Sequence, residues 1–355
     1  MTIKNPGFPE YIAAYLKEND LSEFTVGRVT QEHRERYVVS SGDEDYEAEI
    51  TGNMRFTAAD RSDFPAVGDW VAMKVYDMDM AIIHQILPRK SILERQSVSK
   101  AGEKQVISAN VDVAFVVQSI DSNFNINRLE RYMTICHSSA IEPILVISKT
   151  DLARANEVED AIISVKAAHP DLRYVLLSNF SNAGLDEIRS VMVSGYTYCV
   201  VGSSGTGKST LINNLLHRNI LKTNPLSTST GKGKHTTEHR ELFVLENGAV
   251  IIDTPGMREL GVTDDSDGIR NTFSEIHDLS LKCKFTDCTH TDEKGCVVIE
   301  AIEKGLIDNH SLENYRRLLR EQEHFSETIA ERRKKDREFG KMAKNILKEK
   351  KKTKG

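Results

Sequence analysis

A glycine-rich segment that ends in lysine and serine is the clearest chemical feature of the chain. It reads GSSGTGKS, matches the pattern G-x-x-x-x-G-K-[ST], and lies between an apolar strand and a helix. The backbone N–H groups of such a loop curl around a phosphate, and the helix N-terminus adds positive charge. We expect Lys208 to reach and stabilise the β- and γ-phosphates during catalysis, and the Ser209 hydroxyl to bind Mg²⁺. The residues assigned to this phosphate loop are Gly202, Ser203, Ser204, Gly205, Thr206, Gly207, Lys208, Ser209 and Thr210.

Two further segments fit a Mg²⁺-dependent phosphate site. The sequence DTPG at residues 253–256 ends an apolar strand, where Asp253 can bind Mg²⁺ through water and the Gly256 N–H can contact the γ-phosphate. The stretch before it, 223–238, is rich in Gly, Ser, Thr and Lys, which is typical of a nucleotide-dependent switch loop. Thr236 or Thr237 of this loop can complete the metal shell. The magnesium ligands are expected to be Ser209, Thr237 and Asp253.

The segment SKTD follows the apolar strand PILVIS and has residue types that recognise guanine; it comprises Ser148, Lys149, Thr150 and Asp151. Asp151 can accept hydrogen bonds from guanine N1–H and N2–H₂, and the Lys149 stem can lie against the base. Just past the next strand, Ser178 and Asn179 can offer a backbone N–H to guanine O6. These positions are strand ends, where open α/β folds bind ligands. A kinase or ATPase with the same phosphate loop would need no counterpart of Asp151.

The order of these segments is rotated relative to the usual GTPase. The base-reading segments at 148–151 and 178–179 precede the phosphate loop, whereas in the usual order they follow it. Such a circular permutation of the sequence preserves the sheet and the pocket when the original termini lie close together in space. The motifs therefore predict a circularly permuted core that hydrolyses GTP with Mg²⁺.

A cluster of metal-ligand types lies further along the chain, with the spacing C-x4-C-x-H-x5-C. The chain has five cysteines and no apolar leader near its start, which argues against a disulfide framework and favours a metal site. Cys136 and Cys199 fit buried thiols instead. The candidate metal ligands are Cys283, Cys288, His290 and Cys296.

The elements that must position these groups change in character near residue 111. Residues 24–87 alternate apolar and polar positions in short runs, which predicts five antiparallel strands in an OB-type β-barrel. Such a barrel binds oligonucleotides or only packs against other domains, and the pattern favours neither. From 111 onward, apolar runs alternate with helical patterns, which predicts a parallel sheet. Its strands are expected at 113–118, 143–148, 173–177, 197–201, 241–245 and 249–253, and its helices at 127–139, 156–168, 185–193 and 207–217.

Beyond residue 264 the pattern becomes a cysteine-bearing loop region followed by helices at 297–304 and 312–339. The sequence therefore predicts a multidomain chain. The expected domains are an OB-type RNA-binding barrel at 1–100, an α/β P-loop GTPase core at 101–262, and a zinc-binding helical domain with a basic tail at 263–355.

Composition places the chain among globular proteins, with 39% hydrophobic and 28% charged residues and no segment resembling a membrane span or a signal peptide. We therefore expect a cytoplasmic protein. The net charge of -6 conceals a basic tail, because residues 331–355 carry twelve Lys or Arg and four Asp or Glu. Such a tail is either a solvated segment or an electrostatic contact for nucleic acid.

Taken together, these features resemble the RsgA (YjeQ) family, circularly permuted GTPases that act in maturation of the small ribosomal subunit. The resemblance rests on the barrel, on the ordered segments SKTD, LSN, GSSGTGKST, GKGKHTT and DTPG, and on the Cys₃His cluster. It implies that the cluster binds one structural zinc ion, for which three thiolates and an imidazole are suited. It also implies a monomer that binds the 30S subunit and its rRNA, hydrolyses GTP to GDP faster when bound, and assists late maturation.

Two positions depart from familiar patterns. Ser148 stands where an asparagine is usual in the guanine motif, which removes a structural amide. Met257 stands where Ras-like enzymes place a water-orienting glutamine, so the catalytic residue must come from elsewhere, and His235 in the 223–238 loop is the candidate. The alternative left open by Met257 is an RNA-binding protein with a vestigial nucleotide site.

Overall fold

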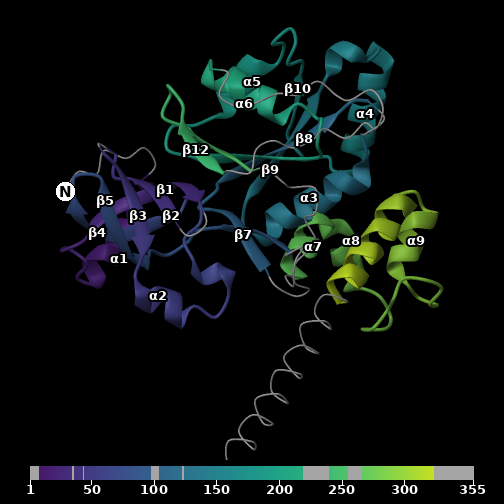
Figure 1. Cartoon of the computed structure of the whole chain (residues 1–355). Coiled ribbons are helices and arrows are strands. Elements are labelled where there is room, and N and C mark those ends of the chain that lie inside the picture. The colour runs from purple at the N-terminus through teal and green to yellow at the C-terminus, as the bar shows by residue number, and fades with distance from the viewer. Residues whose placement is uncertain are drawn as a thin grey trace, which may run out of the picture.

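The computed structural model describes residues 8–33, 36–42, 44–96, 104–121, 124–218, 240–254 and 266–323. Figure 1 shows three parts: a barrel near the N-terminus, a central sheet with helices, and a helical part packed beside α3. Within the described ranges, no helix is long and apolar enough to cross a membrane.

The N-terminal part is a closed five-stranded barrel, as the alternating pattern predicts, but β3 and β5 pair parallel, which corrects the expectation of an entirely antiparallel barrel. Its strands lie in the order β1-β2-β3-β5-β4, and β4 pairs back with β1 to close the ring. Alternation has the expected effect, since β3 buries Tyr46, Ala48 and Ile50 inside and exposes the residues between them. The elements are α1 (Glu10–Glu18), β1 (Thr25–His33), β2 (Arg36–Ser40), β3 (Asp45–Ile50), α2 (Gly52–Thr57), η1 (Arg61–Asp63), β4 (Trp70–Asp77) and β5 (Met80–Ile86).

The outward face of β3 is acidic, because the exposed residues of the strand are Asp45, Glu47 and Glu49. On the neighbouring strand, Arg36 lies opposite Glu49 and forms an exposed ion pair with it at 3.6 Å. Carboxylates in such a row repel phosphate groups. This strand of the barrel is therefore a poor contact for a nucleic-acid backbone.

A two-stranded hairpin between the barrel and the sheet is missing from the sequence prediction. It consists of β6 (Ile92–Gln96) and β7 (Lys104–Ala109), which pair antiparallel. The polar run from Glu94 to Lys104 gives the segment the appearance of a linker. Its buried apolar residues, Leu93 and Ile107, nevertheless join the core under the central sheet.

The central sheet has the strand order β10-β9-β8-β11-β13-β12, and buried clusters cover both of its faces. All neighbours from β10 to β13 are parallel, so their carboxyl ends meet at one edge. The strands are β8 (Val113–Ser119), β9 (Glu142–Ser148), β10 (Tyr174–Leu177), β11 (Thr197–Val201), β12 (Glu241–Val244) and β13 (Val250–Asp253). The helices between them are α3 (Ile126–Ser138), η2 (Thr150–Leu152), α4 (Ala155–Ala168), α5 (Leu185–Val191) and α6 (Lys208–Leu216).

One strand corrects the expectation of a parallel sheet. β12 pairs antiparallel with β13, and the register places Glu241 opposite Asp253. The residues between the two strands are too few for a crossover helix, so the chain can only turn back in a hairpin.

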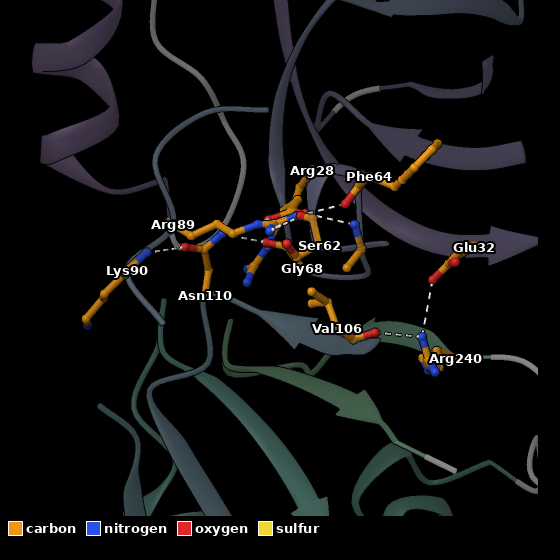
Figure 2. A network of polar contacts seen from close by, with 12 residues as sticks. Arg28, Glu32, Ser62, Phe64, Gly68, Arg89, Lys90, Val106, Asn110 and Arg240 are labelled. Atoms are coloured by element: carbon orange, nitrogen blue, oxygen red, sulfur yellow. Dashed lines mark hydrogen bonds and ion pairs between the residues drawn. The ribbon is translucent and has the colours of Figure 1, made fainter. Parts of the chain in front are cut away.

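The barrel and the sheet are hydrogen-bonded into one unit. β12 pairs with β1, at Glu241 and Gln31, which makes the barrel a continuation of the sheet. We call this β1–β12 pairing the barrel seam. The buried guanidinium of Arg28 on β1 adds a second connection, because it donates to Thr197 Oγ1 on β11 at 2.7 Å. Figure 2 shows Arg240, which precedes β12, donating to a Glu32 carboxylate of β1 and to the Val106 carbonyl of β7.

Buried polar groups stabilise the barrel beside this seam. Arg89 donates to both carboxylate oxygens of Asp69 at 2.8 and 2.7 Å, and also to the carbonyls of Ser62 and Phe64. Asp69 is fully buried, and burial raises the pKa of its carboxyl although Arg89 opposes the shift. Such a pair holds its loop in one arrangement, because a partner left alone would be a buried unpaired charge.

The third part is a helical unit with its own apolar core. It contains α7 (Ser266–Thr272), α8 (Ser274–Ser280), α9 (Val297–Glu303) and a helix at 309–323, and its core includes Ile276, Val298 and Leu318. α7 and α8 correct the expectation of a loop there. The last helix confirms the start of the pattern at 312–339, whose remainder lies outside the described residues. Polar side chains attach this unit to α3, since Arg131 forms a two-bond ion pair with Glu321.

Candidate functional site

The phosphate loop lies where the sequence motif places it, between β11 and α6. Gly202 has φ +143°, and a Cβ there would lie 2.2 Å from the Val117 carbonyl oxygen on β8. Thr206 Oγ1 and Lys208 Nζ both donate to the Ser203 carbonyl, at 2.9 and 2.6 Å. These bonds curl the loop into a cup at the N-terminus of α6, a position suited to an anion.

Asp253 ends β13 next to this cup and has the electrostatics of a cation ligand. The residue is only 7% exposed. Burial raises the pKa of its carboxyl to about 6, the nearby Lys208 ammonium opposes the shift, and Glu241 adds to it. Burial therefore outweighs the attraction of Lys208, and the ionised carboxylate is destabilised. A divalent cation beside Asp253 would stabilise the ionised form.

The guanine-type segment lies at the carboxyl end of β9, as predicted. Lys149 has the left-handed φ of +62° and its ammonium forms an ion pair with Asp121 at 3.0 Å, which fixes the lysine stem. Asp121 in turn accepts a hydrogen bond from Ser119 Oγ at 2.8 Å. Asp151 lies in η2 with its side chain exposed, free to meet a ligand from solvent. No sequence pattern indicates the supporting role of Asp121.

The second base-reading segment follows β10 and touches the phosphate loop. The Ser178 N–H donates to the Ala183 carbonyl at 2.9 Å, so of the two predicted amides Asn179 N–H is the better candidate for guanine O6. The Asn179 side chain donates from Nδ2 to the Gly207 carbonyl at 3.0 Å. From the other side, Ser148 Oγ donates to the Thr206 carbonyl at 2.7 Å. The fold thus brings all three segments together at one sheet edge.

The remaining predicted site residues lie outside the described ranges, so the structure says nothing of their positions. They are His235, Thr236, Thr237, Gly256 and Met257.

The four metal-ligand candidates converge in the helical unit, and their donor atoms all lie within 4.8 Å of one another. His290 Nδ1 is 3.4 Å from Cys296 Sγ and 3.7 Å from Cys283 Sγ, and those two sulfurs are 3.9 Å apart. The structure therefore confirms that these four side chains lie close enough together to share one metal ion.

Two further hydrogen-bonded groups stabilise the loop that carries the four candidate ligands. Cys296 precedes α9, and its sulfur accepts the Ile299 N–H at 3.5 Å, which joins this ligand to the first turn of the helix. The Thr289 hydroxyl donates to the Glu293 carboxylate and lowers its pKa to about 2, helped by the backbone N–H groups of Thr289 and Thr291, which donate to it at 2.8 Å. Glu293 therefore organises the loop between the ligands, a role that spacing alone does not reveal.

Comparison with known proteins agrees with this arrangement. The RsgA GTPase family model matches residues 86–263. The chain is 38% identical to "Small ribosomal subunit biogenesis GTPase RsgA 1" of Bacteroides thetaiotaomicron, over 91% of this chain and 90% of that protein. It is 33% identical to "Small ribosomal subunit biogenesis GTPase RsgA 2" of Vibrio parahaemolyticus, over 99% and 94% respectively.

Solved structures share the fold. YjeQ from Thermotoga maritima superposes with a TM-score of 0.64 at 24% identity, covering 84% of this chain and 98% of that chain. YloQ, described as a circularly permuted GTPase, superposes with a TM-score of 0.60 at 22% identity, covering 88% and 96%. The predicted circular permutation is thereby confirmed.

The raised pKa of Asp253 predicts a pH-dependent stability. Because the folded-state pKa of about 6 exceeds the ordinary 3.8, the folded protein loses stability as pH rises through this window. The loss is about 3 kcal/mol when complete. Asp253→Asn should therefore melt at a higher temperature than the parent without added Mg²⁺, by a margin that grows between pH 5 and pH 7.5.

Thermal melts of both proteins across that pH range measure the margin. Asp186→Asn is the control, because its carboxylate lies on the surface of the same domain with its side chain 98% exposed. Its margin should stay flat with pH. An equally flat margin for Asp253→Asn would show that the carboxyl is not destabilised by burial.

Proposed function

Since the chain belongs to the RsgA GTPase family and is a GTP hydrolase, we propose that it assists late maturation of the small (30S) ribosomal subunit. The names of its relatives state this role for those proteins. The observation that best supports a working nucleotide site in this chain is the contact of both base-reading segments with the phosphate loop.

The proposed mechanism is in-line attack of water on the γ-phosphate, with most of the rate from positioning and charge stabilisation. Lys208 at the end of the loop would neutralise charge on the β- and γ-phosphates. Ser209, Thr237 and Asp253 would hold Mg²⁺, and the buried Asp253 carboxylate fits that use. Bound Mg²⁺ supplies charge neutralisation at the phosphates. His235 is proposed to orient the water, in the place of the glutamine that Met257 replaces.

Guanine selectivity is proposed to come from Asp151. Replacing its carboxylate by an amide in Asp151→Asn exchanges an acceptor for a donor, so the variant should shift its preference from GTP toward xanthosine triphosphate. Competition binding of GTP, XTP and ATP measures this shift. If the variant prefers GTP over XTP as strongly as the parent does, Asp151 does not read the base.

The Cys₃His cluster is proposed to hold one structural zinc ion. With Zn–S near 2.3 Å and Zn–N near 2.0 Å, ligand atoms on a tetrahedron lie roughly 3.5–3.8 Å apart. The observed separations of 3.4, 3.7 and 3.9 Å agree with this. Four protein ligands leave no open position, so the ion would stabilise the fold and take no part in hydrolysis.

Elemental analysis of the purified protein should accordingly find one zinc per chain. Cys288→Ser should lose the metal and loosen the helical unit, because metal binding supplies folding energy there, while GDP binding persists. Cys136→Ala is the control, since this cysteine is buried in the core of the central sheet and not in the core that contains the Cys₃His cluster, so its loss should leave zinc content unchanged. A parent protein without zinc would contradict the assignment.

The proposed partner is the small subunit and its rRNA, which implies that a cytoplasmic monomer docks on a highly charged surface. The basic tail at 331–355 supplies the cationic residues for phosphate contacts. The acidic outward face of β3 would be directed away from phosphates. Docking is proposed to complete the site by bringing His235 or an RNA group to the γ-phosphate.

This proposal predicts slow GTP turnover by the isolated protein and strong stimulation by 30S subunits. Activating partners of other GTPases raise rates by roughly 10³ to 10⁵. His235→Ala should lose most of the stimulated rate and keep GTP binding, whereas Lys208→Ala should lose binding itself. Stimulation should fall steeply with added salt, because phosphate contacts release counterions.

Turnover of GTP and of ATP, with and without subunits across a salt series, decides the matter. Fast hydrolysis that is indifferent to subunits would contradict the coupled mechanism. Hydrolysis of ATP at the rate of GTP would instead favour an ATPase.

A further inference from the structure

Two side chains hold consecutive carbonyl groups of the phosphate loop. Ser148 Oγ donates to the Thr206 carbonyl at 2.7 Å, and Asn179 Nδ2 donates to the Gly207 carbonyl at 3.0 Å. We propose that Asn179 is a positioning residue, which together with Ser148 clamps the phosphate loop in its binding conformation. The inference rests on the proposed use of this loop for guanine nucleotides.

The clamp acts on the amides that would bind phosphate. In a trans peptide the C=O and the following N–H point in opposite directions. The Gly207 carbonyl also accepts the Leu211 N–H of α6 at 2.9 Å, so Asn179 is its second donor. With the Thr206 and Gly207 carbonyls held in this way, the N–H groups of Gly207 and Lys208 point to the opposite side of their peptide planes. Those are the N–H groups at the start of α6, where an anion is favoured.

One hydroxyl cannot perform both tasks. Ser148 has a single hydroxyl proton, and its oxygen already lies 2.7 Å from the Thr206 carbonyl and 3.3 Å from the Gln118 carbonyl. The asparagine that is usual at this position would bring two N–H donors. Here the amide is supplied from the second base-reading segment by Asn179, so the departure at Ser148 does not leave the loop without an amide donor.

The orientation of the Asn179 amide is itself set by the structure. Asn214 on α6 donates from Nδ2 to Asn182 Oδ1 at 3.1 Å and lies 3.5 Å from Asn179 Oδ1. This contact turns the Asn179 amide nitrogen toward the loop. Gly207 allows the approach, because a Cβ at its φ of +90° would lie 2.6 Å from Asn179 Nδ2.

Asn179→Ala separates this role from base recognition, because the variant keeps the backbone N–H proposed for guanine O6. Loss of one hydrogen bond should raise the Kd for GDP roughly three- to tenfold. KM for GTP should rise by a similar factor while kcat changes little, because the clamp prepares the loop before chemistry. Preference for GTP over XTP should remain, unlike in Asp151→Asn. Fluorescent GDP titration and steady-state kinetics give these values.

Two further variants sharpen the test. Asn182→Gly removes the other side chain that Asn214 contacts, and glycine suits its φ of +60°. Because the Asn179 bond to Gly207 stays in place, this control should lose clearly less GDP affinity than Asn179→Ala. Ser148→Asn in the Asn179→Ala background returns an amide from the opposite side and should restore much of the lost affinity. Melting temperature and zinc content establish that each variant is folded.

The outcomes are distinct. Unchanged GDP affinity in Asn179→Ala overturns the clamp, and so does an equal loss in Asn179→Ala and Asn182→Gly, which would indicate general loosening of the segment. A parent protein that binds no guanine nucleotide overturns the proposed function instead. Should the double variant fail to fold, the comparison of the two single variants still decides.

Discussion

The parallel pairing of β8 with β11 is the constraint on which the candidate site depends. β8 belongs to the half of the core that carries the base-reading segments, β11 leads into the phosphate loop, and their register pairs Val116 with Val201. Both strands are buried throughout, so apolar contact holds them together. Gly202 follows at once and crosses Val117 at a distance that excludes any side chain. A side chain there would force apart the two halves that the permutation rearranges in sequence.

Sequence patterns predicted this core well because strands that are buried on both faces consist of unbroken apolar runs, whereas surface strands and helices alternate apolar and polar residues. The runs around Val116, Val146 and Val200 gave the strands to within a residue or two, and chemical motifs followed their carboxyl ends. The carboxyl ends of parallel strands lie at the same edge of a sheet. Predicting the strands was therefore enough to predict that segments far apart in the sequence meet there. The Cys₃His geometry was predictable for a different reason, since a tetrahedral ion restricts ligand spacing.

What the sequence left out depends on contacts between distant residues. The β6–β7 hairpin has a polar run between its strands and appears as a linker, yet Leu93 and Ile107 are buried by the sheet above them. α7 and α8 are short, and short helices are stabilised mainly by packing, which no local pattern records. The Ser148 and Asn179 hydrogen bonds likewise join polar residues to backbone carbonyls of another segment. Carbonyls carry no sequence signature, so such bonds appear only when the fold is known.

Strand β12 shows how the three-dimensional arrangement links nucleotide and barrel. It follows the segment 219–239 in sequence, pairs on one side with β13, which ends at Asp253, and on the other with β1 of the barrel. Arg240 at its start is hydrogen-bonded to both β1 and β7. If binding of the γ-phosphate displaced β12, these bonds would transmit the displacement to the barrel seam. Linkage makes this reciprocal, so a partner that favours one position of the barrel must change nucleotide affinity by the same free energy. The acidic face of β3 restricts which partners can do so, because it disfavours approach by phosphate from that side.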